Sequence, residues 1–260
     1  MNKIDRKKFI RTTGLAAAGV LFFPGSVFAV EPGHVTIKAI AFDGFPIFDP
    51  RPVFKAVDEL FPEKGKQLSE IWKAKQFGYQ WLRIAGNQYK DFWEITKDAL
   101  DFASEECGLS LSQQQKEYLL DKYRGIDVWP DVKNALQALK EQNLKLGFLS
   151  NMTGEMLRAG IQNSNTGNLF DFVISTDSQK TFKPDPDAYQ MAVDVLKLKK
   201  EEILFVAFAG WDMAGAKWFG YPTYWLNRLH APADKLDAQP DGTGNDMNSL
   251  VDFVKLYNRK

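Results

Sequence analysis

The chain of 260 residues has one cysteine and two histidines. A single cysteine, Cys107, excludes an internal disulfide and any Cys-x-x-Cys metal site. His34 and His230 have no second ligand at the spacing that metal sites use. The sequence therefore gives no sign of a metal centre.

The sequence also lacks an excess of charge of either sign, with 33 Lys and Arg residues against 33 Asp and Glu residues. The sequence therefore has no excess of basic residues that would favour binding to a nucleic acid. Residues 1–29 contain five basic side chains and one acidic side chain, Asp5. The remainder carries 28 basic and 32 acidic side chains, so we expect a mildly acidic body.

No apolar run is long enough to cross a membrane, which takes about 20 residues. The run at residues 14–23 follows a basic segment at residues 5–11 and precedes small residues that end at Ala29. This order predicts a signal peptide over residues 1–29, hence export to the periplasm with no stable membrane anchor. The basic segment resembles a twin-arginine signal with Lys7 at the second arginine, and an ordinary secretory signal is the alternative.

Beyond residue 34, short apolar segments alternate with amphipathic helices. The alternation predicts a Rossmann-like, doubly wound parallel sheet of the α/β class. Asp185-Pro186 has the form of a helix N-cap followed by proline at the first helical position. The polar run 237–248 is interpreted as a surface loop. The predicted strands are 35–42, 144–149, 172–175, 203–208 and 221–226, and the predicted helices are 132–142, 153–164, 186–196 and 213–219.

Residues 50–127 have no strand pattern, and their apolar residues recur at helical spacing. We therefore expect an all-helical cap domain at 50–127, inserted into a core domain made of residues 35–49 and 128–260. An exposed apolar face on the cap is compatible with a homodimer.

Polar residues follow four of the predicted strands: Asp43, Ser150 with Asn151, Lys183 and Asp212. In parallel sheets, ligands bind beyond the carboxyl ends of the strands. Each residue has an ordinary structural alternative, such as a turn, a helix cap or a solvated charge. Their joint placement favours an active site in which a carboxylate beside an ammonium attacks an electrophilic carbon and forms an ester that water hydrolyses.

The order of these residues resembles the haloacid dehalogenase superfamily, and further motifs resemble its type II L-2-haloacid dehalogenases from residue 35 to the end of the chain. The Tyr-x-Trp-Leu-Arg segment is the most family-specific of them. The motifs are Ile71-Trp72-Lys73-Ala74-Lys75-Gln76, Tyr79-Gln80-Trp81-Leu82-Arg83, Leu149-Ser150-Asn151, Phe182-Lys183-Pro184-Asp185 and Trp211-Asp212.

The resemblance implies the catalytic roles. Asp43 would displace halide from a short 2-haloalkanoic acid and form the ester. Lys183 would lower the pKa of this nucleophile, and Asp212 would orient Lys183 and the hydrolytic water. Ser150 would bind the substrate carboxylate.

The resemblance also implies the binding residues. Asn151 would contact the departing halide, Phe92 and Trp211 would form the wall around the alkyl group, and Tyr189 would lie near the lysine. Lys73 stands where the family has an arginine that takes the halide and the carboxylate. The family needs no metal or cofactor, so the expected partners are a small carboxylate substrate and water.

Three positions depart from the family pattern. The segment from Asp43 to Asp49 is one residue short, with Pro46-Ile47 in place of Gly-Thr-Leu. Lys73 keeps the arginine's charge without its planar fork. Ala209 replaces an asparagine that helps to place the water.

These departures leave alternatives open. One is a hydrolase of another activated carbon–halogen or carbon–nitrogen bond, and another is a catalytically impaired protein that binds small carboxylates. A phosphatase is less consistent with the sequence, because Phe45 stands where the leaving-group acid would be.

Overall fold

A six-stranded sheet forms the centre of the computed structural model, which describes residues 35–259. The strand order is β3-β2-β1-β4-β5-β6 and every neighbouring pair is parallel. The predicted doubly wound parallel sheet is confirmed. The strands are β1 (Ala39–Phe42), β2 (Lys145–Ser150), β3 (Phe172–Ser175), β4 (Ile203–Ala207), β5 (Thr223–Leu226) and β6 (Gly242–Gly244).

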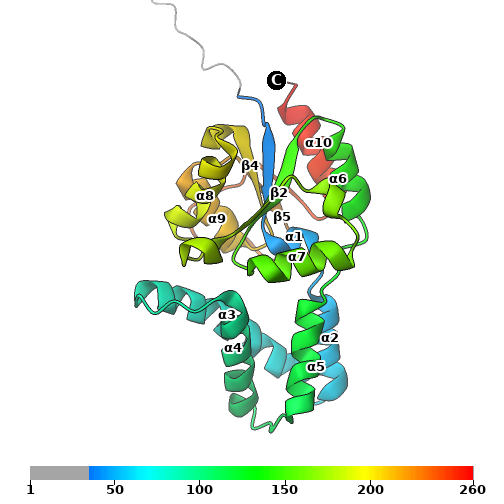
Figure 1. Cartoon of the computed structure of the whole chain (residues 1–260), viewed down its shortest axis with the longest axis vertical. Helices are drawn as coiled ribbons and strands as arrows, with labels where there is room; N and C mark the ends of the chain where they lie inside the picture. Colours follow the sequence, from blue (N-terminus) through cyan, green and yellow to red (C-terminus); the bar gives the residue numbers. More distant parts are fainter. Residues whose placement is uncertain (1–34, 260) are drawn as a thin grey trace, which may run out of the picture. The chain divides into compact units, whose positions relative to one another are not determined.

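The central strand β1 is buried on both faces, as its uninterrupted apolar sequence requires. Ile40 and Phe42 belong to one hydrophobic cluster, whereas Ala39 and Ala41 belong to the other. Figure 1 shows helices on both sides of the sheet, with α8 and α9 on one side and α6 and α10 on the other. The helices of these layers are α6 (Val132–Lys140), α7 (Gly154–Asn163), α8 (Pro186–Leu196), α9 (Gly210–Phe219) and α10 (Met247–Tyr257).

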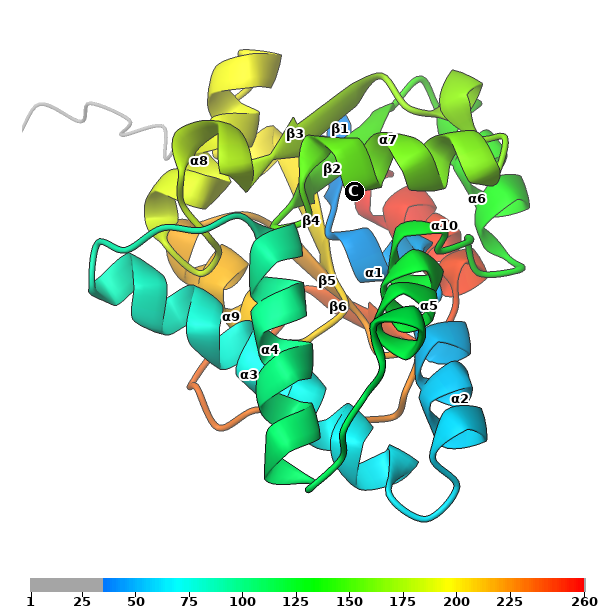
Figure 2. The same cartoon turned by 60° about the horizontal axis from the view of Figure 1, so that its bottom comes forward.

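Four of the six helices between β1 and β2 form an insertion: α2 (Arg51–Leu60), α3 (Gly65–Ala85), α4 (Phe92–Glu106) and α5 (Gln113–Arg124). They lie beyond the carboxyl end of β1, with α2 beside α5 and α4 beside α3 (Figures 1 and 2). Asp91 caps α4, and a capping box of Ser112 and Gln115 begins α5.

The chain enters and leaves this helical segment along two adjacent backbone stretches. An antiparallel bridge pairs Phe48 with Val128, and the backbone N–H of Asp49 donates to the carbonyl of Asp127 at 2.8 Å. The division into a core domain and a cap domain at these residues stays a prediction.

Two parts of the sequence fold differently from the prediction. Strand β1 begins at Ala39, four residues later than expected, and is followed by the single helical turn α1 (Gly44–Ile47). The predicted loop 237–248 contains β6, which pairs with β5, and the first residues of α10. The sequence of β6, Gly-Thr-Gly, has only one residue that favours strands, so no apolar pattern identified it.

The proposed signal peptide at residues 1–29 lies outside the described residues. Within residues 35–259, no helix has the length and hydropathy of a membrane span.

Candidate active site

The predicted catalytic residues meet at the carboxyl ends of neighbouring strands. Asp43 follows β1, and Ser150 and Asn151 lie at the end of β2. Lys183 lies in the segment before α8, and Asp212 lies in the first turn of α9, after β4. Strand β1 is where the chain order of the sheet reverses, with β2 on one side and β4 on the other, and such a position forms a crevice.

Lys183 joins the two carboxylates. Its Nζ atom donates to Oδ1 of Asp43 at 2.8 Å and to Oδ2 of Asp212 at 2.6 Å. Lys183 and Asp212 are buried, whereas the side chain of Asp43 keeps 14% of its surface exposed. Asp43 is therefore the member of this group that a substrate can reach.

Burial and charge act in opposite directions on this group. Burial lowers the pKa of Lys183, but attraction by Asp212 and Asp43 and hydrogen bonds to both outweigh it, so the pKa lies above its usual value. Burial raises the pKa of Asp212 to about 6 against the opposing effect of Lys183. The lysine is thus a fixed cation beside Asp43.

Tyr189 lies behind Asp212 and not on a substrate surface. Its hydroxyl donates to Oδ1 of Asp212 at 2.7 Å, and its side chain is fully buried. Burial, together with the nearby Asp212, raises the pKa of Tyr189 well above its usual value. The predicted substrate-binding role of Tyr189 therefore becomes a hydrogen bond that holds Asp212.

The turn after Asp43 brings the backbone close to the end of β2. Oδ2 of Asp43 accepts from the backbone N–H of Phe45 at 3.3 Å, and Oγ of Ser150 accepts from that of Met152 at 3.2 Å. A Cβ at Gly44 would lie 2.7 Å from Sδ of Met152 and 3.1 Å from Oγ of Ser150. A side chain there would require the end of the Met152 side chain and the Ser150 hydroxyl to move slightly, so the backbone at Gly44 is closely packed against the end of β2.

Asn151 shapes the backbone around Lys183. Its Oδ1 accepts from the backbone N–H of Lys183 at 2.9 Å, and its Nδ2 donates to Oε1 of Gln80 at 2.8 Å and to the carbonyl of Lys183 at 3.4 Å. Both amide hydrogens therefore have protein acceptors. The predicted contact with halide would compete with these bonds.

Gln80 is a site residue that the sequence reasoning did not identify. It is fully buried on α3, one turn from the buried Gln76, which accepts from the hydroxyl of Tyr123 at 3.0 Å and donates to Oγ1 of Thr96 at 2.6 Å. Two glutamines at i and i+4 on the apolar face of a helix were the available signal, because a buried amide needs partners.

A cavity of about 440 Å³ opens above Asp43. Helices α2 to α5 supply one side and the strand-end loops supply the other. Lys183 and Asp212 are not on its surface. Lys183 contacts Asp43 from behind, and Asp212 contacts Lys183. The predicted residues on its surface are Asp43, Lys73, Phe92, Ser150, Asn151 and Trp211.

Lys73 is the cation of this cavity that has no acidic partner within ion-pair distance among residues 35–259. Its Nζ atom lies 4.6 Å from the centre of the Phe54 ring. Because it has no acidic partner there and lies beside a mostly apolar cavity, this ammonium is available to pair with an anionic group of a ligand.

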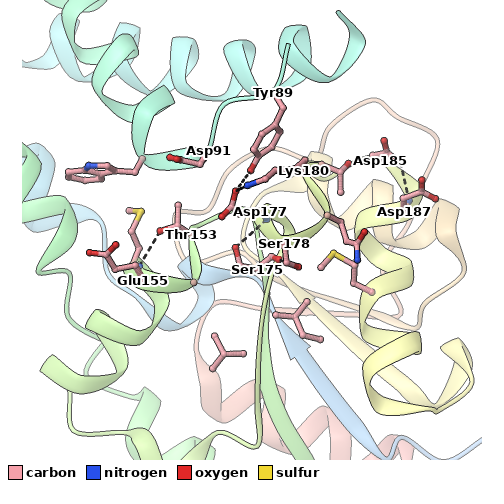
Figure 3. A pocket seen from close by; sticks show the side chains of 18 of the residues that line it. Tyr89, Asp91, Thr153, Glu155, Ser175, Asp177, Ser178, Lys180, Asp185 and Asp187 are labelled. Atoms are coloured by element: carbon pink, nitrogen blue, oxygen red, sulfur yellow. Dashed lines mark hydrogen bonds and ion pairs between the residues drawn. The ribbon is translucent and has the colours of Figure 1, made fainter. Parts of the chain in front are cut away.

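A second, larger cavity of about 1290 Å³ has polar walls and contains none of the residues Asp43, Lys183 and Asp212 (Figure 3). Across it, the hydroxyl of Tyr89 donates to Oδ1 of Asp177 at 2.8 Å, and Nζ of Lys180 donates to the same oxygen at 2.9 Å. No cluster of metal-ligating side chains occurs here or elsewhere in the described part of the chain.

The fold and this constellation are those of a hydrolase of the haloacid dehalogenase-like class, whose family model matches residues 19–220. The chain belongs to that family.

The activities named for relatives of this chain are more specific than the family description. The chain is 35% identical to an (S)-2-haloacid dehalogenase of Pseudomonas sp. (strain YL), over 84% of this chain and 95% of the relative. It is 35% identical to haloacetate dehalogenase H-2 of Moraxella sp. (strain B), over 85% of this chain and 99% of the relative. A solved structure of the L-2-haloacid dehalogenase from Xanthobacter autotrophicus, with chloropropionic acid covalently bound, matches with a TM-score of 0.78 and 30% identity, covering 85% of this chain and 99% of that chain.

Proposed function

We propose that the chain is a hydrolytic dehalogenase of 2-haloalkanoic acids that acts through an ester on Asp43. The observation that carries the proposal is the position of Asp43, whose carboxylate reaches the cavity while its Oδ1 atom is held by the buried Lys183. The family and the named activities of the relatives support it.

In the first step, a carboxylate oxygen of Asp43 attacks C2 of the substrate. A carbon–oxygen bond forms, the carbon–halogen bond breaks, and the halide leaves with the electron pair. The ammonium of Lys183 stays beside Asp43 and holds its Oδ1 atom during the attack. Lys73 and Ser150 supply a cation and a hydroxyl for the substrate carboxylate, and Phe92 and Trp211 contact its apolar part.

In the second step, water attacks the carbonyl carbon of the Asp43 ester. The bond from that carbon to the ester oxygen on C2 breaks, and the 2-hydroxy acid leaves with this oxygen, which came from Asp43. One proton and one halide ion are released for each molecule of water consumed. Asp212, held by Tyr189 and Lys183, is the second carboxylate bound by the lysine that contacts Asp43.

The test is halide release from (S)-2-chloropropionate by the purified chain. We expect release by the wild type, no release by Asp43→Asn, and wild-type rates for Asp101→Asn, which changes an exposed carboxylate on α4. In a single turnover in H₂¹⁸O, the label should enter Asp43 and not the product. Label in the product alone would show direct attack by water and overturn the ester mechanism.

We also propose that residues 1–29 direct export to the periplasm and that residues 50–127 act as a cap domain. The basic segment followed by a short apolar run supports export. Fractionation of cells that express a C-terminally tagged chain, with N-terminal sequencing of the product, tests it. A mature chain that begins at Val30 is the expected result, and an uncleaved cytoplasmic chain would contradict it.

A homodimer is a further proposal, supported by exposed apolar side chains near the C-terminal end of α3. Leu82 is 70% exposed and Trp81 is 40% exposed. Light scattering should give twice the mass of the mature chain, and Leu82→Glu should shift it to the mass of the monomer.

A further inference from the structure

The cavity above Asp43 has more room than a short haloacid occupies. Its volume is about 440 Å³, and a water molecule takes about 30 Å³ of the liquid, so the cavity has the volume of roughly fifteen waters. A 2-chloropropionate ion has only six non-hydrogen atoms. Cavities of this size usually hold considerably larger ligands.

The walls of the cavity contain two pairs of aromatic rings. The rings of Phe77 and Trp211 meet edge to face with their centres 5.7 Å apart. The centres of the Phe45 and Phe208 rings are 5.9 Å apart. All four side chains are only half-buried, so part of each ring remains available for contact.

The charged and polar groups of the cavity can bind the polar end of a substrate, so the aromatic rings are free to contact its apolar part. Asp43 and Ser150 lie at the strand ends, Lys73 lies on α3, and Arg51, Lys55 and Asp58 lie on α2. Asp43, Ser150 and Lys73 can take the reacting carbon and the carboxylate of a substrate. The rings then contact what is attached to C2, and aromatic rings favour offset and edge-to-face contacts with another ring.

We propose that the substrates of this site are 2-haloacids with an aryl-sized apolar group on C2, such as 2-halo-3-phenylpropionates. The proposal rests on the proposed function and names its substrate class. Each buried methylene of the substituent should raise kcat/KM about fourfold. A phenyl group should therefore raise it at least tenfold over the methyl group of 2-bromopropionate.

The first test compares kcat/KM for (S)-2-bromo-3-phenylpropionate and (S)-2-bromopropionate. The expected ratio is ten or more in favour of the phenyl compound. Ala209→Leu, which fills part of the cavity, should lower this ratio at least tenfold. Ala85→Leu, a matched change at an exposed residue of α3, should leave the ratio unchanged. A ratio of one or below in the wild type would overturn the proposal.

The second test measures binding without chemistry, using calorimetry with 3-phenylpropionate and propionate. Binding of 3-phenylpropionate at least tenfold tighter than propionate supports the substrate class, and equal or weaker binding overturns it. If no haloacid releases halide but 3-phenylpropionate still binds tighter, the proposed function fails and the inference about the cavity stands. Halide release from 2-bromopropionate alone retains the proposed function and overturns this inference.

Discussion

The side-chain amide of Asn151 donates a 2.8 Å hydrogen bond to Oε1 of Gln80, which joins the loop after β2 to the C-terminal half of α3. Both side chains are buried, and Oδ1 of the same asparagine accepts from the backbone N–H of Lys183. A residue of the inserted helices thus helps to fix the segment that carries Lys183.

Replacing Gln80 by Leu should therefore affect both stability and catalysis. The change removes the acceptor of a buried amide, which costs about 1–3 kcal/mol of the free energy of unfolding. It also releases the asparagine that positions Lys183, so kcat should fall more than KM changes. Urea denaturation and steady-state kinetics measure the two effects.

Gln67→Leu is the matched control for this change, because Gln67 is exposed on the same helix α3. It should leave stability and kcat near the wild-type values. If Gln80→Leu resembled this control, the hydrogen bond to Asn151 would have no positioning role.

Replacing Lys183 by Met should remove activity and destabilise the fold. Two carboxylates, Asp43 and Asp212, would remain close together without the cation between them, and breaking a buried ion pair costs about 3–5 kcal/mol. The loss should shrink as the pH falls, because protonation of one carboxyl relieves the repulsion. Urea denaturation at several pH values measures it.

Lys180→Met provides the comparison, since Lys180 pairs with Asp177 at the surface and its side chain is 65% exposed. This change should cost less than about 1 kcal/mol. Equal losses for the two lysines would contradict the central role given to Lys183.

Replacing Tyr189 by Phe should move the acid limb of the activity profile to higher pH. Burial raises the pKa of Asp212 to about 6, and the hydrogen bond from Tyr189 opposes this by stabilising the ionised form. Activity that needs the ionised carboxylate should therefore fall as the pH decreases through about 6. Without the hydrogen bond the limb should lie about one pH unit higher.

Single-turnover rates between pH 4 and 9 measure this limb. Tyr118→Phe, a change of an exposed tyrosine on α5, should leave the profile unmoved. A limb that stays in place in Tyr189→Phe would assign the titration to another group.

Replacing Tyr89 separates two contacts near the larger cavity. Tyr89→Phe loses the hydrogen bond to Asp177 but keeps the stacking on Phe182, whose ring centre is 5.1 Å away. The free energy of unfolding should fall by about 1 kcal/mol with little change in kcat. Tyr89→Ala also loses the stacking, so stability should fall by about 2 kcal/mol more.

Because Phe182 directly precedes Lys183 in the chain, kcat should also fall in Tyr89→Ala. Thermal unfolding and kinetics on the two variants measure these effects. If kcat is the same in both, the ring of Tyr89 does not support the lysine segment.

The sequence predicted the part of this molecule that depends on local pattern. Alternating apolar segments and amphipathic helices identified the parallel sheet, and strand ends identified Asp43, Lys183 and Asp212, which the structure brings into contact. The helix start at Asp185-Pro186 was also predicted, and the Asp185 carboxylate accepts from the backbone N–H of Asp187.

What the sequence did not predict depends on contacts between distant segments. The apolar face of α3 marks Gln80 as a buried amide that needs partners, but only the folded structure shows that one of them is Asn151. Tyr189 lies behind Asp212 because α8 packs beside α9. Strand β6 forms because β5 presents a free edge to a glycine-rich segment that has no strand pattern of its own.

The position of β1 in the sheet also sets an order of events during folding. Ala39 pairs with Lys145 on one side and with Ile203 on the other, so both neighbours of β1 are synthesised more than one hundred residues after it. Contacts of such long range form slowly because a long loop must close first. We expect the amides of β1 to gain protection late in refolding, after those of α3 and α4, in pulsed hydrogen exchange. The strand that leads to Asp43 would then complete the candidate site only when nearly the whole chain is present.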